Sequence, residues 1–150
     1  MIDKISAFLT SLKQGSEESI EESITIELAC TVLLCEVMRA DGLINNQERQ
    51  HLSQLVSQKF LCNSNTADAL IEEAIELCEQ ANDFHRFTSI VNRHYQPEEK
   101  IKIIALLWQL ALADDHLAAI EEHTIRRIAD LLHLRHSEYI TAKSSVIAKP

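Results

Sequence analysis

The sequence predicts an all-α protein: about eight helices that form a helical bundle with a pseudo-two-fold internal repeat. The 150 residues include only two glycines and two prolines, whereas a β-sandwich or barrel of this size needs on the order of ten tight turns rich in such residues. Apolar residues make up 46% of the chain and recur at helical spacing almost throughout, which is typical of amphipathic helices. We expect residues 1–150 to form a single domain, because the length suits one.

Two helices are predicted before Gly42. Apolar residues at helical spacing predict a short first helix over Ile2–Leu12. Ser19 and Glu22 have the spacing of a capping box, in which each side chain satisfies a free backbone N–H of the other residue. They predict the start of a long apolar helix that carries Ile24 and ends near residues 41–42.

The middle of the chain contains a second capping signal and a turn. Asn45 and Glu48 again have the spacing of a capping box, and they predict a helix that continues to about residue 59. The polar cluster Asn63-Ser64-Asn65 is typical of a turn. The apolar stripe that follows predicts a helix over residues 67–80.

Four further helices are predicted in the second half. Asp83 is placed to cap a short helix, and Pro97 has the position expected of a first helical residue. The helix after Pro97 is the most apolar of the chain, and we expect its Trp108 in the core. Two more helices are predicted over about 118–132 and 137–147.

The chain also contains an internal repeat. A shift of 73 residues places Leu33-Leu34 on Leu106-Leu107 and Ala40-Asp41 on Ala113-Asp114. The same shift places Ile44 on Leu117, Glu48 on Glu121, Leu52 on Ile125, Leu55 on Ile128 and Leu61 on Leu134. The repeat units are therefore about 24–61 and 97–134, each an apolar helix, a short acidic connection and a second helix. Two such hairpins can bury each other's apolar stripes.

The charge of the chain excludes some classes of partner. There are 14 basic and 23 acidic residues, which give a net charge of −9. We therefore expect no nucleic-acid partner, because phosphate backbones require a basic face. No apolar run approaches the roughly 18 residues of a membrane span, and the N-terminus lacks a signal-peptide pattern. These features predict a cytoplasmic protein. We also expect a protein partner, and a second copy of the chain, in a homodimer, is one candidate.

The cysteines do not indicate a metal or redox motif. Cys30, Cys35, Cys62 and Cys78 form no C-x-x-C pair. Three of them fall within predicted helices, where a free cysteine behaves as a small apolar residue. We expect all four to be reduced and buried, as in a cytoplasmic protein.

The two acidic connections are the candidate functional site. Asp41 closes one helix and Glu48 opens the next, and Asp114 and Glu121 have the same roles in the second repeat. Two interpretations stay open. In the first, the glutamates only cap helix N-termini. In the second, the four carboxylates converge across the pseudo-two-fold axis and bind a divalent cation, since oxygen ligands suit Ca²⁺, Mg²⁺ or Mn²⁺.

Two neighbouring possibilities are weaker. The run from Asp41 to Glu48 matches the latter half of an EF-hand loop, but the first and third ligand positions would be Val37 and Arg39, which cannot donate carboxylate oxygens. His116 and His123 flank the second connection, where a one-sided site for Zn²⁺ or Ni²⁺ can be imagined. No nucleophile, base and orienting group occur in a recognisable pattern, so we expect a protein that is not an enzyme.

The repeated Ala-Asp-x-x-[Ile/Leu] connection with a glutamate seven residues after the aspartate resembles the TerB-like family of tellurite-resistance-associated proteins. The similar segments are Ala29–Leu55 and Ile104–Leu132. The same helical domain occurs at the N-terminus of the membrane co-chaperone DjlA. The resemblance implies an all-α, two-fold bundle and a non-enzymatic, metal-associated stress or scaffold module, often bacterial. It places the family's acidic positions on Asp41, Glu48, Asp114 and Glu121.

One position departs from the family pattern. The second connection has Asp115 where the pattern favours the glycine that the first connection has at Gly42. The resemblance therefore does not imply two equivalent connections.

Overall fold

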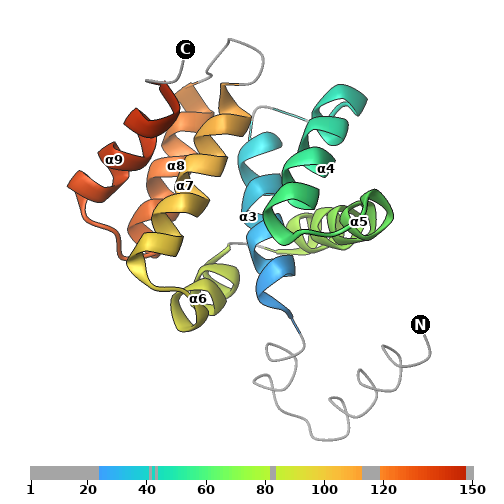
Figure 1. Cartoon of the computed structure of the whole chain (residues 1–150), viewed down its shortest axis with the longest axis horizontal. Helices are drawn as coiled ribbons and strands as arrows, with labels where there is room; N and C mark the ends of the chain where they lie inside the picture. Colours follow the sequence, from blue (N-terminus) through green and yellow to red (C-terminus); the bar gives the residue numbers. More distant parts are fainter. Residues whose placement is uncertain (1–23, 41, 43, 82–83, 113–118, 148–150) are drawn as a thin grey trace, which may run out of the picture.

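The computed structural model describes residues 24–40, 42, 44–81, 84–112 and 119–147 (Figure 1). The regular structure of these ranges consists of α3 (Ile26–Met38), α4 (Asn46–Phe60), α5 (Ser64–Gln80), α6 (His85–His94), α7 (Pro97–Ala111), α8 (Ala119–Leu131) and α9 (His136–Ile147). The all-α prediction is confirmed, and seven of the eight predicted helices are found. The predicted helix Ile2–Leu12 lies outside the described residues, as does the Ser19–Glu22 capping box.

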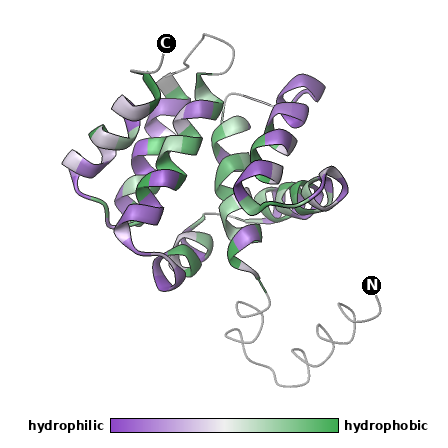
Figure 2. Cartoon of the chain, viewed as in Figure 1, coloured by the Kyte–Doolittle hydropathy of each residue, from purple (hydrophilic) through white to green (hydrophobic). Residues whose placement is uncertain are grey.

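Helix α3 is the centre of the bundle. Its sequence is largely apolar, and most of its ribbon is green in Figure 2; ten of its 13 residues are buried. It contacts α4, α5, α6, α7 and α8. A helix this apolar has to be enclosed by its neighbours; α4 to α8 enclose α3, and α9 packs on α7 outside them.

Helix α3 begins later than the sequence predicts. Thr25 has an extended backbone, and its Oγ1 accepts a hydrogen bond of 3.1 Å from the backbone N–H of Leu28. Thr25 is therefore the N-cap, and Ile24 precedes the helix instead of lying within it. The prediction that placed Ile24 inside the helix is wrong because a threonine hydroxyl close to the apolar run supplies the cap.

Two predicted helix starts are confirmed, and one is corrected. The Asn45–Glu48 capping box opens α4, and Pro97 is the first residue of α7. Helix α5 begins at Ser64, three residues before the predicted start, because Asn63 Oδ1 accepts the backbone N–H of Thr66 at 2.8 Å. The predicted turn cluster is thus mostly the first turn of a helix. Asp83, the predicted cap of α6, lies outside the described residues.

The C-terminal end of α8 is held by side chains from two other helices. Lys100 of α7 is buried, and its ammonium donates a hydrogen bond of 3.1 Å to the carbonyl of Leu132. Asn92 of α6 donates through Nδ2 to the carbonyl of Leu131 at 2.9 Å. These carbonyls have no partner within the helix, so the two donors fasten α8 to α6 and α7.

The helix bounds follow the predicted repeat. A shift of 73 residues moves the end of α3 onto the end of α7 and the start of α4 onto the start of α8. Helix α3 contacts both α7 and α8, and α4 contacts α7, as expected if each hairpin packs against the other. One pair departs from the pattern, because Leu61 is exposed while Leu134 is buried. The superposition of the two hairpins in space stays a prediction.

The core contains the side chains that the sequence predicts. Trp108 is fully buried, and Cys30, Cys35 and Cys78 are buried free thiols. Cys62 is only half-buried, so the prediction that all four cysteines are buried is wrong for the one that lies at the end of α4. Within the described ranges, none of the helices has the length and apolar character to span a membrane.

Candidate functional site

The predicted site lies at the connections that lead into α4 and α8. Figure 1 shows the ends of α3 and α7 and the starts of α4 and α8, which these connections join. Glu48 and Glu121 are described, whereas Asp41 and Asp114 lie outside the described residues. Gly42, beside the first of these aspartates, is exposed and has a φ of +149°, which side chains disfavour.

Glu48 acts as a helix cap. Its Oε1 accepts the backbone N–H of Asn45 at 3.0 Å, and Asn45 Oδ1 accepts the backbone N–H of Glu48 at 2.8 Å. Both donors are among the amides that a helix leaves unpaired at its first turn. One oxygen of the Glu48 carboxylate is therefore used by the helix, as the structural interpretation of the acidic connections predicts.

Glu121 has the equivalent position but a different environment. It is the third residue of α8, as Glu48 is the third residue of α4. Its side chain is buried, with 8% of its surface exposed. A carboxylate in the first turn of a helix is stabilised in its charged form by the helix dipole. Nothing in the residue pattern distinguishes this buried glutamate from the half-buried Glu48.

The described part of the chain contains no group of three or more His, Cys, Asp or Glu side chains arranged to hold a metal ion. The four-carboxylate site therefore needs Asp41 and Asp114, and it stays a prediction. The carboxylate donors that are described fit a hard divalent cation in their chemistry. His123 is exposed on α8, and its proposed companion His116 lies outside the described residues, so the one-sided Zn²⁺ or Ni²⁺ site is a prediction too.

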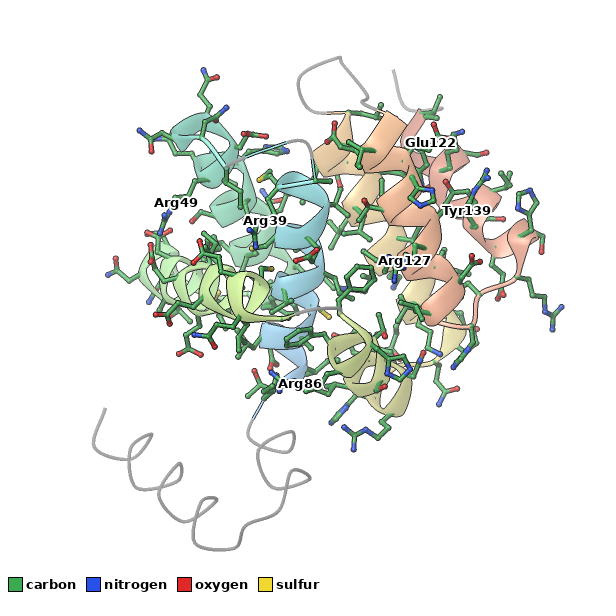
Figure 3. All side chains as sticks on the ribbon, turned by 180° about the vertical axis from the view of Figure 1, so that it is seen from behind. Arg39, Arg49, Arg86, Glu122, Arg127 and Tyr139 are labelled. Carbon is green, nitrogen blue, oxygen red and sulfur yellow. The ribbon has the colours of Figure 1, made fainter. Side chains whose placement is uncertain are left out.

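A groove of about 490 Å³ lies close to the head of α8. It is lined by residues of α3, α5 and α8 and by Phe84, and it contains both acidic and basic side chains, among them Glu36, Arg39 and Arg127. Figure 3 shows Arg39 at the end of α3 and Arg127 on α8 from the same side. The Arg127 guanidinium lies 5.3 Å from the centroid of the Phe84 ring, a cation–π distance.

Two thiols meet beneath this groove, and the residue pattern does not indicate their contact because they lie on different helices. Cys78 of α5 lines the groove, and its Sγ lies 3.5 Å from the carbonyl of Val32 on α3. A hydrogen bond with the Cys35 thiol, together with burial, raises the pKa of the Cys78 thiol. The Cys78 thiol is therefore protonated at neutral pH and is not an activated nucleophile.

A third buried thiol, Cys30, lies in the N-terminal half of α3. Burial raises the pKa of the Cys30 thiol from 9.0 to about 12. Burial also raises the pKa of the neighbouring Tyr95 hydroxyl from 10.0 to about 12. These two groups stay neutral in the physiological range, so they belong to the packing of α3 and not to a reactive site.

The comparison with protein families decides what kind of domain these helices form. The family model described as tellurite resistance protein TerB matches residues 27–144. The chain belongs to the TerB family. The matched range runs from the first turn of α3 into α9, so the family match includes residues of all seven described helices. No curated protein and no solved structure matches the chain.

The family match confirms the resemblance that the acidic connections indicate. The TerB domain includes Glu48, Glu121 and the positions of Asp41 and Asp114 within its matched range. It also includes features that the residue pattern does not indicate, above all the buried Lys100 and the paired thiols of Cys35 and Cys78. Those features depend on contacts between helices that are far apart in the sequence.

Proposed function

We propose that the chain is a non-enzymatic TerB module that associates with a divalent cation at the connections leading into α4 and α8. The observation that carries this proposal is the equivalent placement of Glu48 and Glu121, each the third residue of its helix, α4 and α8. Carboxylate oxygens at these two positions have the chemistry that a hard divalent cation prefers.

The ligands of this proposed site are Asp41, Glu48, Asp114 and Glu121. Their carboxylate oxygens suit Ca²⁺, Mg²⁺ or Mn²⁺ better than they suit Zn²⁺, which prefers nitrogen and sulfur ligands. Glu48 would contribute the oxygen that its capping bond does not use. The cation would then neutralise part of the negative charge of these four side chains, in a chain whose net charge is −9.

Calorimetric titration with each of the four cations tests the proposal. We expect the wild-type chain to bind at least one of them more tightly than millimolar. The Asp41→Ala, Asp114→Ala double variant and the Glu121→Gln variant should lose this binding. Glu76→Gln is the matched control, because Glu76 is exposed on α5 and should not affect it. Absence of submillimolar binding, or equal binding by all variants, would refute the cation site.

A second candidate is a protein-interaction module in which the acidic connections are only caps. The capping box of Asn45 and Glu48 favours it, because that carboxylate already has a structural role. Large exposed apolar side chains also favour it: Leu61 is 91% exposed and Ile147 55%. In this case Glu48→Ala lowers the stability of the fold by about 1 kcal/mol and leaves the titrations unchanged.

The proposal also makes expectations about enzymatic activity, cellular role and oligomeric state. A non-enzymatic module should show no phosphatase or peptidase activity in a broad substrate screen with Mn²⁺ added, and turnover abolished by Glu121→Gln would refute it. A stress-response or scaffold role in the bacterial cytoplasm is to be checked by cell fractionation. Sedimentation velocity checks whether the module is a homodimer.

A further inference from the structure

A second groove lies on a part of the bundle that the acidic connections do not reach. It has a volume of about 330 Å³ and runs between α4 and α7, the two helices that flank α3 in Figure 1. Leu55, Gln58 and Lys59 line it from α4. This α4–α7 groove has an apolar floor, because Leu55 is buried in the core.

The α7 side of the groove is a straight stripe. Lys102, Ala105, Leu106 and Gln109 line it, and their spacing of three, four and seven residues places them on one face of the helix. They span two helical turns, roughly 10 Å. The α4 residues repeat the same spacing over one turn. The α4–α7 groove therefore follows the direction of helices on both sides.

The charge of the α4–α7 groove is opposite to that of the molecule. Lys59 and Lys102 face it from the two helices, and its lining contains no acidic side chain. The chain as a whole has a net charge of −9. Lys102 is exposed, and Lys59 is half-buried, so both ammonium groups can meet a ligand from solvent. Two cations beside an apolar floor complement a ligand that is both anionic and apolar.

We propose that the α4–α7 groove binds an acidic amphipathic helix of a partner protein. Leucine-sized side chains of that helix would cover Leu55, Ala105 and Leu106, and glutamates on each flank of its apolar stripe would pair with Lys59 and Lys102. An amphipathic helix lays an apolar face into a groove at this same spacing. The inference is independent of the cation site, because none of its residues lies at the connections into α4 and α8.

The test uses the full chain and a synthetic helical peptide with leucines at positions i, i+4 and i+7 and glutamates beside them. We expect the peptide to perturb the NMR signals of Leu55, Ala105 and Leu106, and added salt to weaken its binding. A control peptide in which lysines replace all glutamates should bind at least about tenfold more weakly. Equal binding of both peptides, or signal changes confined to other helices, would overturn the proposal.

Matched charge variants locate the effect. The Lys59→Glu, Lys102→Glu variant should weaken binding of the acidic peptide at least about tenfold. The Arg93→Glu, Arg135→Glu variant changes the net charge equally at exposed positions outside the groove, and its affinity should stay within about twofold. Equal losses in the two variants would mean that only overall charge matters. Binding to phosphatidylglycerol vesicles without binding to the peptide would replace the protein partner with a lipid surface.

A second double variant, Lys59→Gln, Lys102→Gln, removes both charges without reversing them. It tests the proposal even if the charge-reversed variant does not fold. Circular dichroism confirms that each variant is helical before binding is measured. The neutral variant should lose the salt dependence of peptide binding and several-fold of its affinity. Unchanged salt dependence in a folded neutral variant would refute the role of the two lysines.

Discussion

At the scale of single residues, Leu61 combines two unfavourable features. It ends α4 with a left-handed backbone, φ 52° and ψ 48°, and its side chain is 91% exposed. A residue with a Cβ atom pays roughly 1–2 kcal/mol in this conformation, and glycine is the usual occupant of such a position. The fold therefore tolerates strain and an exposed apolar side chain at the same place.

Replacing Leu61 with glycine should stabilise the protein. We expect Leu61→Gly to raise the free energy of unfolding by about 0.5–1 kcal/mol, less than the full relief because glycine also gains freedom in the unfolded chain. Urea denaturation measures the change. Leu61→Ala is the control, since it removes the exposed side chain but keeps the strained backbone. An equal gain from alanine would show that strain is not the cause.

The buried Cys30 thiol and the Tyr95 hydroxyl predict a loss of stability in alkali. Their pKa values are raised to about 12 in the folded chain, from 9.0 and 10.0. Below pH 9 both states keep these protons, and the stability is fully present. Between pH 9 and 12 the unfolded chain releases protons that the folded chain retains, so the free energy of unfolding falls with rising pH.

Urea denaturation at several pH values from about 8 to 11 measures this decline. The Cys30→Ala, Tyr95→Phe variant should show a flatter profile over the same range, even if its stability at neutral pH is lower. A variant profile as steep as that of the wild-type chain would contradict the assignment.

Residue-level prediction succeeds where the cause is local. The Asn45–Glu48 capping box depends only on two side chains three residues apart, so the sequence predicts it correctly. The left-handed backbone of Leu61 has no such signal, because leucine disfavours that conformation. The burial of Glu121 likewise depends on how α8 packs, which no local pattern contains.

At the scale of helices, the end of α8 depends on donors from outside the helix. Lys100 donates to the Leu132 carbonyl from the buried side of α7. A backbone carbonyl left without a partner in a buried place costs about 1–3 kcal/mol. Lys100 is thus a capping residue supplied by tertiary contact, and its charge is also favourable near a helix C-terminus.

Lys100→Met should lower the free energy of unfolding by about 1–3 kcal/mol, because methionine keeps the apolar stem and removes the donor. Thermal or urea denaturation measures it. Lys102→Met is the matched control: Lys102 is an exposed lysine of the same helix, and its replacement should change stability by less than about 0.5 kcal/mol. Similar effects of the two substitutions would argue against the capping role.

The start of a helix is predictable where the sequence offers a single capping residue for it. Pro97 marks the start of α7 correctly because proline suits a first helical position and few others nearby do. The start of α3 is misplaced because Thr25 lies closer to the apolar run than the Ser19–Glu22 pair does. Several capping residues precede that helix, and only the packed structure selects among them.

At the scale of the whole molecule, the fold class is predictable because apolar residues recur at helical spacing along the chain. The end of α3 and the start of α4 recur at the predicted shift in α7 and α8, and the spatial repeat of the two hairpins stays a prediction. The candidate site is less predictable than the fold. Its residues have distinct roles, a surface cap for Glu48 and a buried carboxylate for Glu121, although the pattern treats them alike.

The α4–α7 groove belongs to the same scale. Lys59 and Lys102 are 43 positions apart in the sequence, and each alone reads as an ordinary solvated lysine. Their common surface exists only because α4 and α7 flank α3. A groove between two helices can be recognised in a structure, but the spacing of apolar residues along the sequence does not predict it.

The burial of Trp108 gives the molecule an internal optical reporter. It is the only tryptophan of the chain, and its ring lies 6.0 Å from that of Tyr139 on α9 and 5.0 Å from the Lys143 ammonium. Indole fluorescence shifts to longer wavelength when water reaches the ring. If α9 undocks alone, the Trp108 emission should shift to longer wavelength while most of the helical circular dichroism persists. If the fluorescence and the circular dichroism change together, α9 leaves only when the whole bundle unfolds.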